Sequence, residues 1–531
     1  MSTSTSTAPA ADNANNSDSD HDYVSEDNQV EPSDAQLVSS SKKKKKKKSK
    51  KSKIPQDIID KVTEAVKEEH GEHSEAAKEE NIRLALEHLK IMDVAKGKVG
   101  IGGINRKDMG EHKFWATQPV PQSSQDQSPS DDGPIEPSVP REQVRQEPYP
   151  IPKEFVWSTI DINDPNQLKE LYELLSLHYV EDDEAAFRFN YSAEFLQWAL
   201  QPPGYHQEWL VGVRVASTKR LVAFISGVPI TLKIRQKTVQ ASEINYLCIH
   251  KKLRSKRLTP ILIKEVTRQC HLKGIFQAIY TVGVVLPTPV SVCRYYHRSL
   301  NIPKLVDVKF TYVPRQMTVA RMVRQSKVPT TTSCPGLREM EDRDVEQVHK
   351  LFSRYMGRFT MAHIMSVEDF RHQMLKGKGV GDSVDSRRDK QVTWTYVVEN
   401  PETKQITDFF SFYSLPSTVI GDTKHPVLEA AYMFYSATDA AFGDGVGVES
   451  RVKARLTELY GDALVIANNA KFDVVNALTL LDNVPVLKDL KFGEGNGFLN
   501  FYLYNWKTAP LAGVNATGGV DPGKGVGVVM L

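Results

Sequence analysis

The sequence has few cysteines, and none of them sits in a pattern that would bind a metal or form a disulfide. The 531 residues contain four, which are Cys248, Cys270, Cys293 and Cys334. They form no close pair and no metal-ligand spacing, which is typical of a protein from a reducing compartment. We therefore predict neither structural disulfides nor a metal centre.

Long apolar runs are also absent. No window approaches the roughly 20 consecutive apolar residues that a membrane-spanning helix needs. The amino terminus, MSTSTSTAPA, is polar and lacks the apolar core of a signal peptide. These absences favour a cytoplasmic protein without a membrane span. With 531 residues the chain exceeds one ordinary core, so two domains with tails are expected.

The formal net charge of the chain is only +2, so binding to a polyanion cannot arise from the overall charge. Positive charge is instead concentrated in one segment. Residues 1–40 contain no Lys or Arg, whereas Lys42 to Lys48 is an unbroken lysine run, continued by Lys50, Lys51 and Lys53. Like charges repel, so this block should stay extended. A solvated spacer, a nuclear-type address and an electrostatic tether to ribosomal RNA all fit Lys42–Lys53.

The order of apolar segments predicts a mixed α/β fold. In the first half we predict helices over 168–180 and 259–274, with strands over 209–215, 221–234, 244–249 and 276–286. In the second half we predict strands over 393–400, 406–417, 430–438 and 463–467, and a helix over 471–483. Similar phrases at 305–313 and 487–495 suggest two diverged copies of one α/β unit.

Composition divides the chain into three parts. Residues 1–98 form an acidic and polylysine leader with a marginal helix, 99–326 an N-terminal half and 327–531 a C-terminal half. The stretch 116–152 is rich in Pro, Gln and Ser and should be extended. The preceding HKFW, residues 112–115, is the expected anchor that holds it in place.

A basic loop lies between a predicted strand and a predicted helix, at KKLRSKRLTP (251–260). Thr259 suits the N-cap and Pro260 the first turn, so the loop and the helix start could cradle a phosphate. A solvated basic turn is the simpler alternative. Neither GxxxxGK[ST] nor an early GxGxxG is present. The layout resembles the acetyltransferase fold, although RSKRLT replaces its usual RxxGxG/A turn.

Longer segments resemble the N-myristoyltransferase family. EINYLCIHK (243–251) and KFGEGNGFLNFYLYNW (491–506) are similar to its two signature segments. Further matches are HKFWATQPVP (112–121), RQEPYPIP (145–152), HRSLNIPKL (297–305) and FYSLPST (412–418). The resemblance covers roughly residues 110–531. It implies two acetyltransferase-like halves related by a pseudo-twofold axis, and transfer of myristate from myristoyl-CoA to the N-terminal glycine of proteins.

The resemblance also implies the catalytic groups. Backbone amides of Tyr246 and Leu247 would stabilise the oxyanion, and Asn245 and Thr281 would hydrogen-bond the amine. The carboxylate of Leu531 would act as the base. The residues themselves support this base, because the tail GVGVVML (525–531) is apolar and its burial would raise the pKa of the terminal carboxylate. A hydrophobic strap without chemistry is the alternative.

The same resemblance assigns the binding residues. For acyl-CoA they are Lys113, Phe114, Trp115, Tyr246, Leu247, Cys248, Ile249, Ser255, Lys256, Arg257, Leu258 and Thr259. For the peptide they are Tyr179, Asp182, Asp183, Glu184, Phe187, Phe189, Tyr295, His297 and Ser417. Trp115 could instead merely anchor the leader. We expect Cys248 to be packing rather than a nucleophile, with direct attack by the glycine amine.

Two departures from the family pattern stand out. Asn496 replaces a common Asp, so the preference for basic substrate residues should be weaker. The Gly-rich stretch 507–525 looks like an insertion. We expect a monomer without a prosthetic group, with myristoyl-CoA as co-substrate and Gly-starting nascent proteins as partners. Another acyl-CoA-dependent N-acyltransferase, or a ribosome- or RNA-associated protein, remains the alternative.

Overall fold

The computed structural model describes residues 112–122, 132–181, 185–254, 256–443, 447–515, 518–521 and 523–531. The predicted leader with Lys42–Lys53 lies outside the described residues, as do Asp182, Asp183, Glu184 and Ser255. Within the described ranges, no helix combines the length and the apolar character needed to cross a membrane.

Helices and strands alternate along the chain, as the apolar segments predict. The α-helices are α4 (Pro165–His178), α5 (Ala193–Leu200), α6 (Leu258–Leu272), α7 (Ile302–Asp307), α8 (Val319–Gln325), α9 (Val345–Met356), α10 (Val367–Leu375), α11 (Val448–Asn469) and α12 (Val484–Leu487). The strands of the first half are β1 (Phe155–Thr159), β2 (Phe187–Phe189), β3 (Leu210–Val215), β4 (Leu221–Ile234), β5 (Lys237–Ile249), β6 (Gln277–Val282) and β7 (Ser291–Ser299). Those of the second half are β8 (Leu337–Glu339), β9 (Met361–His363), β10 (Val380–Val384), β11 (Arg387–Asp389), β12 (Thr393–Glu399), β13 (Ile406–Ser414), β14 (Ser417–Val419), β15 (Val427–Leu428), β16 (Ala430–Thr438), β17 (Val474–Leu478), β18 (Gly493–Tyr504) and β19 (Val526–Gly527).

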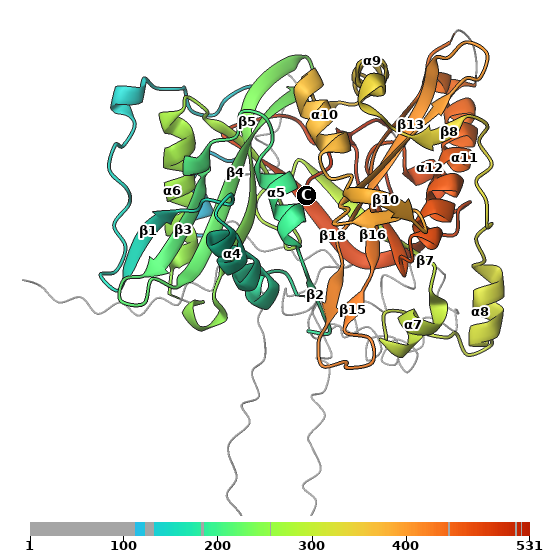
Figure 1. Ribbon diagram of the computed structural model, residues 1–531. Helices are drawn as coiled ribbons and strands as arrows, with labels where there is room; N and C mark the ends of the chain where they lie inside the picture. The colour runs from blue at the N-terminus through green and yellow to red at the C-terminus, as the bar shows by residue number, and fades with distance from the viewer. Residues whose placement is uncertain are drawn as a thin grey trace, which may run out of the picture.

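The mixed α/β fold is confirmed, and one topological unit occurs twice (Figure 1). In the first half, β3, β4 and β5 are antiparallel neighbours, and α6 crosses over to β6, which is parallel to β5. In the second half, β12, β13 and β16 are antiparallel neighbours, and α11 crosses over to β17, which is parallel to β16. A parallel pair needs such a crossover, and a helix usually provides it.

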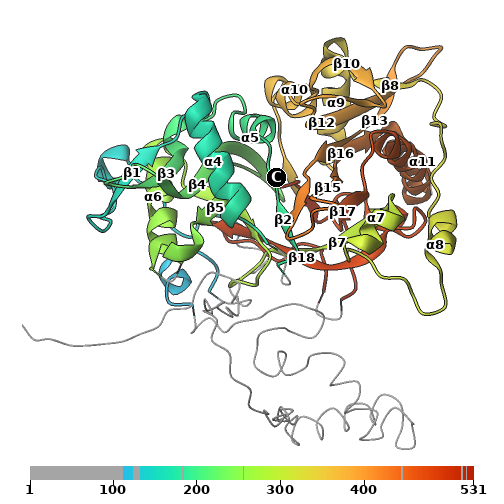
Figure 2. The same cartoon turned by 60° about the horizontal axis from the view of Figure 1, so that its bottom comes forward.

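The two halves share one continuous sheet because each lends a strand to the other. β18, from the end of the chain, lies between β6 and β7, and β7 in turn pairs with β17. Figure 2 shows β18 running beneath both halves. The sheet therefore contains 14 strands in the central order β1-β3-β4-β5-β6-β18-β7-β17-β16-β13-β12-β8.

Three large apolar clusters hold the helices on the sheet. The largest lies on one face, where it takes residues from both halves and from the chain's end, among them Leu171, Phe195, Phe352, Phe370 and Val528. The opposite face is covered half by half, by α6 in one cluster and by α11 in another. The first cluster takes side chains from helices of both halves and from the tail, so it surrounds the region where they meet.

Helix α4 shows how the local sequence builds this core. Asp164 accepts a hydrogen bond from the Asn166 N–H at the N-cap, and Pro165 occupies the first turn. The leucines at 168, 171, 174 and 175 follow helical spacing and are buried. This matches the helix predicted over 168–180, with its start three residues earlier at Pro165.

Two predictions in the second half are wrong. Residues 463–467, predicted as a strand, form the last turns of α11, where they are fully surrounded by core. Residues 471–483, predicted as a helix, contain the strand β17 instead. A short apolar run cannot be assigned to helix or strand by periodicity when every side is buried. The run VVNAL in β17 is such a case, since it is buried between β16 and β7.

The end of the chain is folded into the centre of the molecule, between the two halves (Figures 1 and 2). β19 pairs in parallel with β9, which itself pairs with β4, and the Leu481 N–H donates to the Val526 carbonyl at 2.9 Å. The side chains of Val528, Val529 and Met530 are 0%, 7% and 5% exposed. Burying each such side chain contributes about 1.5–3 kcal/mol, so fraying of the tail is disfavoured.

Close approach at Gly525 offers a test of this arrangement. A Cβ at Gly525 would lie 2.0 Å from the Ala512 carbonyl oxygen. We expect Gly525→Ala to destabilise the protein by roughly 1–3 kcal/mol, because backbone must move. Gly461→Ala in α11, where nothing lies within 4 Å of the added Cβ, should stabilise it by about 1 kcal/mol. Thermal unfolding of both variants is the measurement, and equal midpoints would contradict the described packing of the tail.

Candidate active site

Strand β5 is irregular where the catalytic amides are predicted. Phe224 pairs with Cys248 and Ser226 with Asn245, so Tyr246 and Leu247 together face the single residue Ile225. This is a β-bulge, and Tyr246 has the left-handed φ of +54° that bulky residues rarely adopt. Pairing with β6 has already stopped one step earlier, at Ile244 opposite Tyr280. Bulges of this kind re-aim backbone groups, and the oxyanion role of these amides stays a prediction.

The carboxyl end of the chain meets this strand. The Asn245 Nδ2 donates to an oxygen of Leu531 at 2.6 Å, across 286 positions in the sequence. Upstream, the Val529 N–H donates to the buried Tyr435 hydroxyl at 3.1 Å. The structure thus brings Leu531, Asn245 and Tyr246 together, as the sequence predicts. Thr281 lies on the neighbouring strand β6, opposite Phe501 of β18.

Glu243 belongs to the same group and was missed from the sequence. It lies two residues before Asn245 on β5, and the Asn245 Nδ2 also donates to its Oε1 at 3.2 Å. Burial raises the pKa of Glu243 to about 7, although hydrogen bonds from the Leu531 N–H and from Asn245 lower it. The available signal was an acid within an apolar strand, at the period-2 spacing that puts it on the face of Asn245.

Cys248 lies beside the bulge but has no activating partner. Its side chain is 2% exposed, and its Sγ is 3.8 Å from the Leu174 carbonyl oxygen. Burial raises the pKa of the thiol to about 12, and the positive charge of Arg254 lowers it only in part. A thiol in such surroundings is unreactive because the thiolate is the nucleophile. These observations favour the packing role predicted from the sequence.

The basic loop leads into α6 differently from the prediction. Thr259 is not the N-cap; Arg257 holds that position in the left-handed region, with φ +57°, and no side chain caps the helix. The turn at Arg257 lets the helix begin at Leu258, so that Leu258 and Thr259 are already helical and buried. The first amides of this 15-residue helix follow the exposed Lys256 directly. An anion-binding helix start remains consistent with this geometry.

Positive charge is concentrated around this loop. Arg254 donates to the His178 carbonyl oxygen at 2.6 Å, and Lys251 contacts Glu181 at 2.5 Å. The pKa of His178 is lowered to about 4, first by burial and then by His250, Lys251 and Arg254. The positive potential around this loop disfavours any added cation. It would attract a polyphosphate, so the residues fit the phosphates of an acyl-CoA.

The anchor predicted at residues 112–115 is present. His112 and Trp115 are buried, and the Trp115 ring stacks on Tyr280 at 5.5 Å, which stacks in turn on Tyr502 at 5.1 Å. The Asn505 N–H also donates to the Pro119 carbonyl at 2.8 Å. Anchoring of the segment 112–122 is therefore a structural role of Trp115. Contact of Lys113, Phe114 and Trp115 with acyl-CoA stays a prediction.

The described residues among those predicted to bind peptide come from both halves, and Tyr295 lies beside the tail. Phe187 and Phe189 of β2 pair with β14, where Ser417 is opposite Phe189. Tyr295 of β7 lines a small hollow together with Tyr413, Tyr432, Val529 and Met530. Two further members follow: the Tyr179 ring is 5.9 Å from that of Tyr246, and the His297 Nδ1 is 2.7 Å from the Asn476 Oδ1. Their role in binding peptide stays a prediction.

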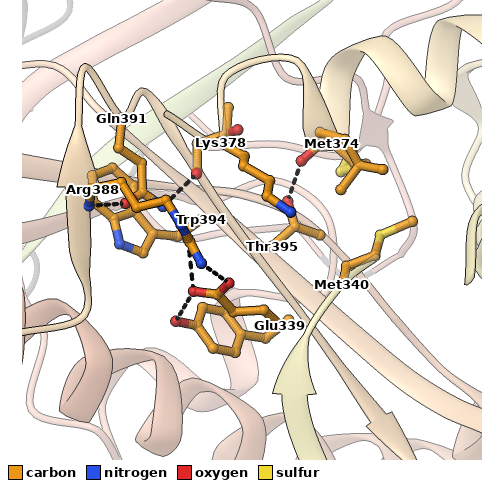
Figure 3. A pocket seen from close by; sticks show the side chains of 11 residues that line it. Glu339, Met340, Met374, Lys378, Arg388, Gln391, Trp394 and Thr395 are labelled. Atoms are coloured by element: carbon orange, nitrogen blue, oxygen red, sulfur yellow. Dashed lines mark hydrogen bonds and ion pairs between the residues drawn. The ribbon is translucent and has the colours of Figure 1, made fainter. Parts of the chain in front are cut away.

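A second hollow lies at the far edge of the sheet, beside β8 and β12 (Figure 3). Its charges already satisfy each other, because the Arg388 NH1 and NH2 groups contact the Glu339 carboxylate at 3.0 and 2.5 Å. The Thr395 hydroxyl likewise donates to the Met374 carbonyl at 2.8 Å. None of the residues that line it belongs to the tail or to β5. The hollow beside Met530 is therefore the better candidate for a substrate.

Two family models match this chain. The model described as "Myristoyl-CoA:protein N-myristoyltransferase, N-terminal domain" matches residues 134–293. The model of the corresponding C-terminal domain matches residues 307–529. Together the two cover most of the described chain, including β5, α6 and the tail up to Val529.

Individual proteins are similar over comparable lengths. A glycylpeptide N-tetradecanoyltransferase of Emericella nidulans is 50% identical over 84% of this chain and 90% of its own length. One from Saccharomyces cerevisiae is 45% identical over 87% of this chain and its full length. A crystal structure of Saccharomyces cerevisiae N-myristoyltransferase with bound myristoyl-CoA superimposes with a TM-score of 0.76 at 44% identity, covering 84% of this chain and all of its own.

The raised pKa of Glu243 predicts a pH-dependent stability. A carboxyl whose pKa rises from 4.5 to about 7 on folding favours the folded state when neutral, so its contribution is lost as the pH rises through 7. Between about pH 4.5 and pH 7, the unfolding temperature of the wild type should fall relative to that of Glu243→Gln, which cannot ionise, and above that interval the difference should level off. Parallel curves for the two proteins over that interval would show that Glu243 titrates normally.

Proposed function

This chain belongs to the myristoyl-CoA:protein N-myristoyltransferase family, and from that premise we propose that it transfers myristate from myristoyl-CoA to the N-terminal glycine of proteins. The observation that carries the proposal is the terminal carboxylate of Leu531, held by Asn245 at 2.6 Å next to the bulge of β5. A carboxylate at this place can act as a base for an incoming amine.

The reaction needs a neutral amine, and this is where Leu531 acts. The α-amino group of a peptide has a pKa near 8 and is mostly protonated at pH 7. The terminal carboxylate takes one proton from the ammonium, while Asn245 and Thr281 hold the nitrogen. The nitrogen lone pair then attacks the thioester carbon, a C–N bond forms and the C–S bond breaks. Coenzyme A leaves as the thiolate with that electron pair, and it takes up the second proton that the nitrogen loses as the amide forms.

Developing negative charge on the thioester oxygen is stabilised by backbone. The N–H groups of Tyr246 and Leu247 serve as donors, which the β-bulge frees from regular pairing. Removal of one oxyanion donor typically costs about 3 kcal/mol of barrier, so this term is large. The unreactive surroundings of Cys248 support direct attack by the amine over an acyl-enzyme intermediate.

Binding of the two substrates is divided between the faces of this centre. The basic loop and the start of α6 bind the phosphates of acyl-CoA, through groups that include Lys256 and Arg257. The peptide lies along β2, β14 and β7, where Phe189, Ser417 and Tyr295 are found. Acyl-CoA binds first and peptide second. The reaction takes place in the cytoplasm on Gly-starting nascent proteins, and ribosome association through Lys42–Lys53 stays a prediction.

The specificity of the transfer tests the proposal. The purified chain is incubated with radiolabelled acyl-CoAs of about 2, 8, 14 and 16 carbons and with peptides that differ only in Gly or Ala at the first position. We expect the fourteen-carbon chain to be transferred to the Gly peptide, with the Ala peptide as a matched control. Preferred transfer of acetyl groups, or equal labelling of both peptides, would favour another N-acyltransferase. Absence of any transfer would refute the proposal.

A further inference from the structure

The Asn245 amide bridges two carboxyl groups. Its Nδ2 donates to Leu531 at 2.6 Å and to the Glu243 Oε1 at 3.2 Å. Both neighbours are acceptors when ionised, and only the NH₂ end of an amide can donate. The orientation of Asn245 is therefore fixed by chemistry. The NH₂ group faces the two carboxyl groups, and the Oδ1 is directed away from them, as an acceptor for a third partner.

Glu243 also faces the main chain of the last residue. The Leu531 N–H lies near enough to the Glu243 carboxyl group to lower the pKa of that carboxyl. The observed hydrogen bonds hold the Leu531 carboxylate through Asn245, and they hold Asn245 in turn through Glu243. Without Glu243, the Asn245 amide would keep the terminal carboxylate as its one carboxyl partner of the two.

The surroundings of Glu243 make an ion-pair role untenable. The titratable groups that face it are the hydroxyls of Tyr246 on β5, Tyr413 on β13 and Tyr435 on β16. The terminal carboxylate of Leu531 shares the Asn245 amide with it. Among the influences on its ionisation there is no lysine or arginine. Desolvation of an acid without a cation is costly, so its position in the site calls for another explanation.

We propose that Glu243 is a positioning residue for acyl transfer, which fixes the Asn245 amide and the Leu531 main chain so that Oδ1 and the terminal carboxylate face the incoming amine. This inference rests on the proposed function. It assigns to Glu243 no contact with substrate. The role is compatible with a second carboxylate nearby, where like charges disfavour each other, because it needs an acceptor oxygen and no charge. The property that matters is the reach of an acceptor oxygen rather than the negative charge.

Three substitutions at Glu243 separate the position of its acceptor oxygen from its negative charge. Glu243→Gln keeps an acceptor oxygen at the same distance and removes the charge, whereas Glu243→Asp keeps the charge and withdraws the oxygen by one methylene. Glu243→Ala removes both. Glu208→Gln, at an exposed acid paired with Lys273 at 3.1 Å, is the matched control. The measurements are the single-turnover rate with acyl-CoA bound, the Kd for myristoyl-CoA and the unfolding temperature.

We expect the rate of Glu243→Ala to fall on the order of 10²-fold, as misplaced reacting groups typically cause, with an unchanged Kd for myristoyl-CoA. Glu243→Gln should recover most of that rate and exceed Glu243→Asp. If Glu243→Ala fails to fold, the comparison between the transfer rates of Glu243→Gln and Glu243→Asp still tests the inference. If Glu243→Asp transfers myristate as fast as Glu243→Gln or faster, the inference is overturned, because the negative charge would then be the property that matters. A wild-type rate for Ala, or losses of rate and Kd in proportion, would overturn it as well.

These outcomes are distinct from a failure of the proposed function. If the wild type transfers no myristate to a Gly peptide, the function is wrong and the variants are not needed. If the wild type is active and the Glu243 variants match Glu208→Gln, only the positioning role is wrong.

Discussion

The structure depends on the burial of an apolar chain end. Val528, Val529 and Met530 are core residues, so the carboxylate that follows them is carried into the interior. A terminus normally frays, because its ordering costs conformational entropy that few contacts repay. Here three sets of contacts offset this entropy cost: strand pairing with β9, the hydrogen bond to the Tyr435 hydroxyl, and burial in the largest apolar cluster. The chain end, which frays in most proteins, is held in a fixed position here.

The exchange of strands explains why this end lies at the centre. β18 inserts between β6 and β7, and it brings the last part of the chain back across the first half. From there the tail runs to β9 and on to the bulge of β5. The loop proposed to bind acyl-CoA belongs to the first half, whereas the strands proposed to bind peptide come from both, β2 and β7 from the first half and β14 from the second. A site made from two copies of one unit needs such a join, since neither copy contains all the groups.

Much of this could be predicted from residues alone, and the failures have physical causes. The alternating and continuous apolar runs of β3, β4, β5, β12 and β16 gave correct strands because their lengths and β-branched content agree. The segments 463–467 and 471–483 were assigned wrongly because burial on all sides erases periodicity. The repeated phrases at 305–313 and 487–495 do not mark equivalent places, since one follows β7 and the other precedes β18. The repeat lies in topology instead.

The site was only partly accessible to sequence reasoning. Burial of the tail followed from its composition, whereas its contact with Asn245 joins residues 286 positions apart and needed the fold. Glu243 escaped notice because an isolated acid in a strand usually points to solvent. Thr259 was taken as the N-cap because Ser and Thr generally are, but the left-handed turn at Arg257 moves the helix start forward.

The central claim is that the terminal carboxylate acts as the base. Its most direct test is a semisynthetic protein whose Leu531 ends in a carboxamide, which keeps the length of the chain and removes the acid. Single-turnover transfer of myristate is then compared with that of the same ligated protein carrying a free carboxylate. The account predicts a transfer rate lower on the order of 10²-fold or more, with unchanged affinity for myristoyl-CoA. Equal transfer rates for the two proteins would contradict it.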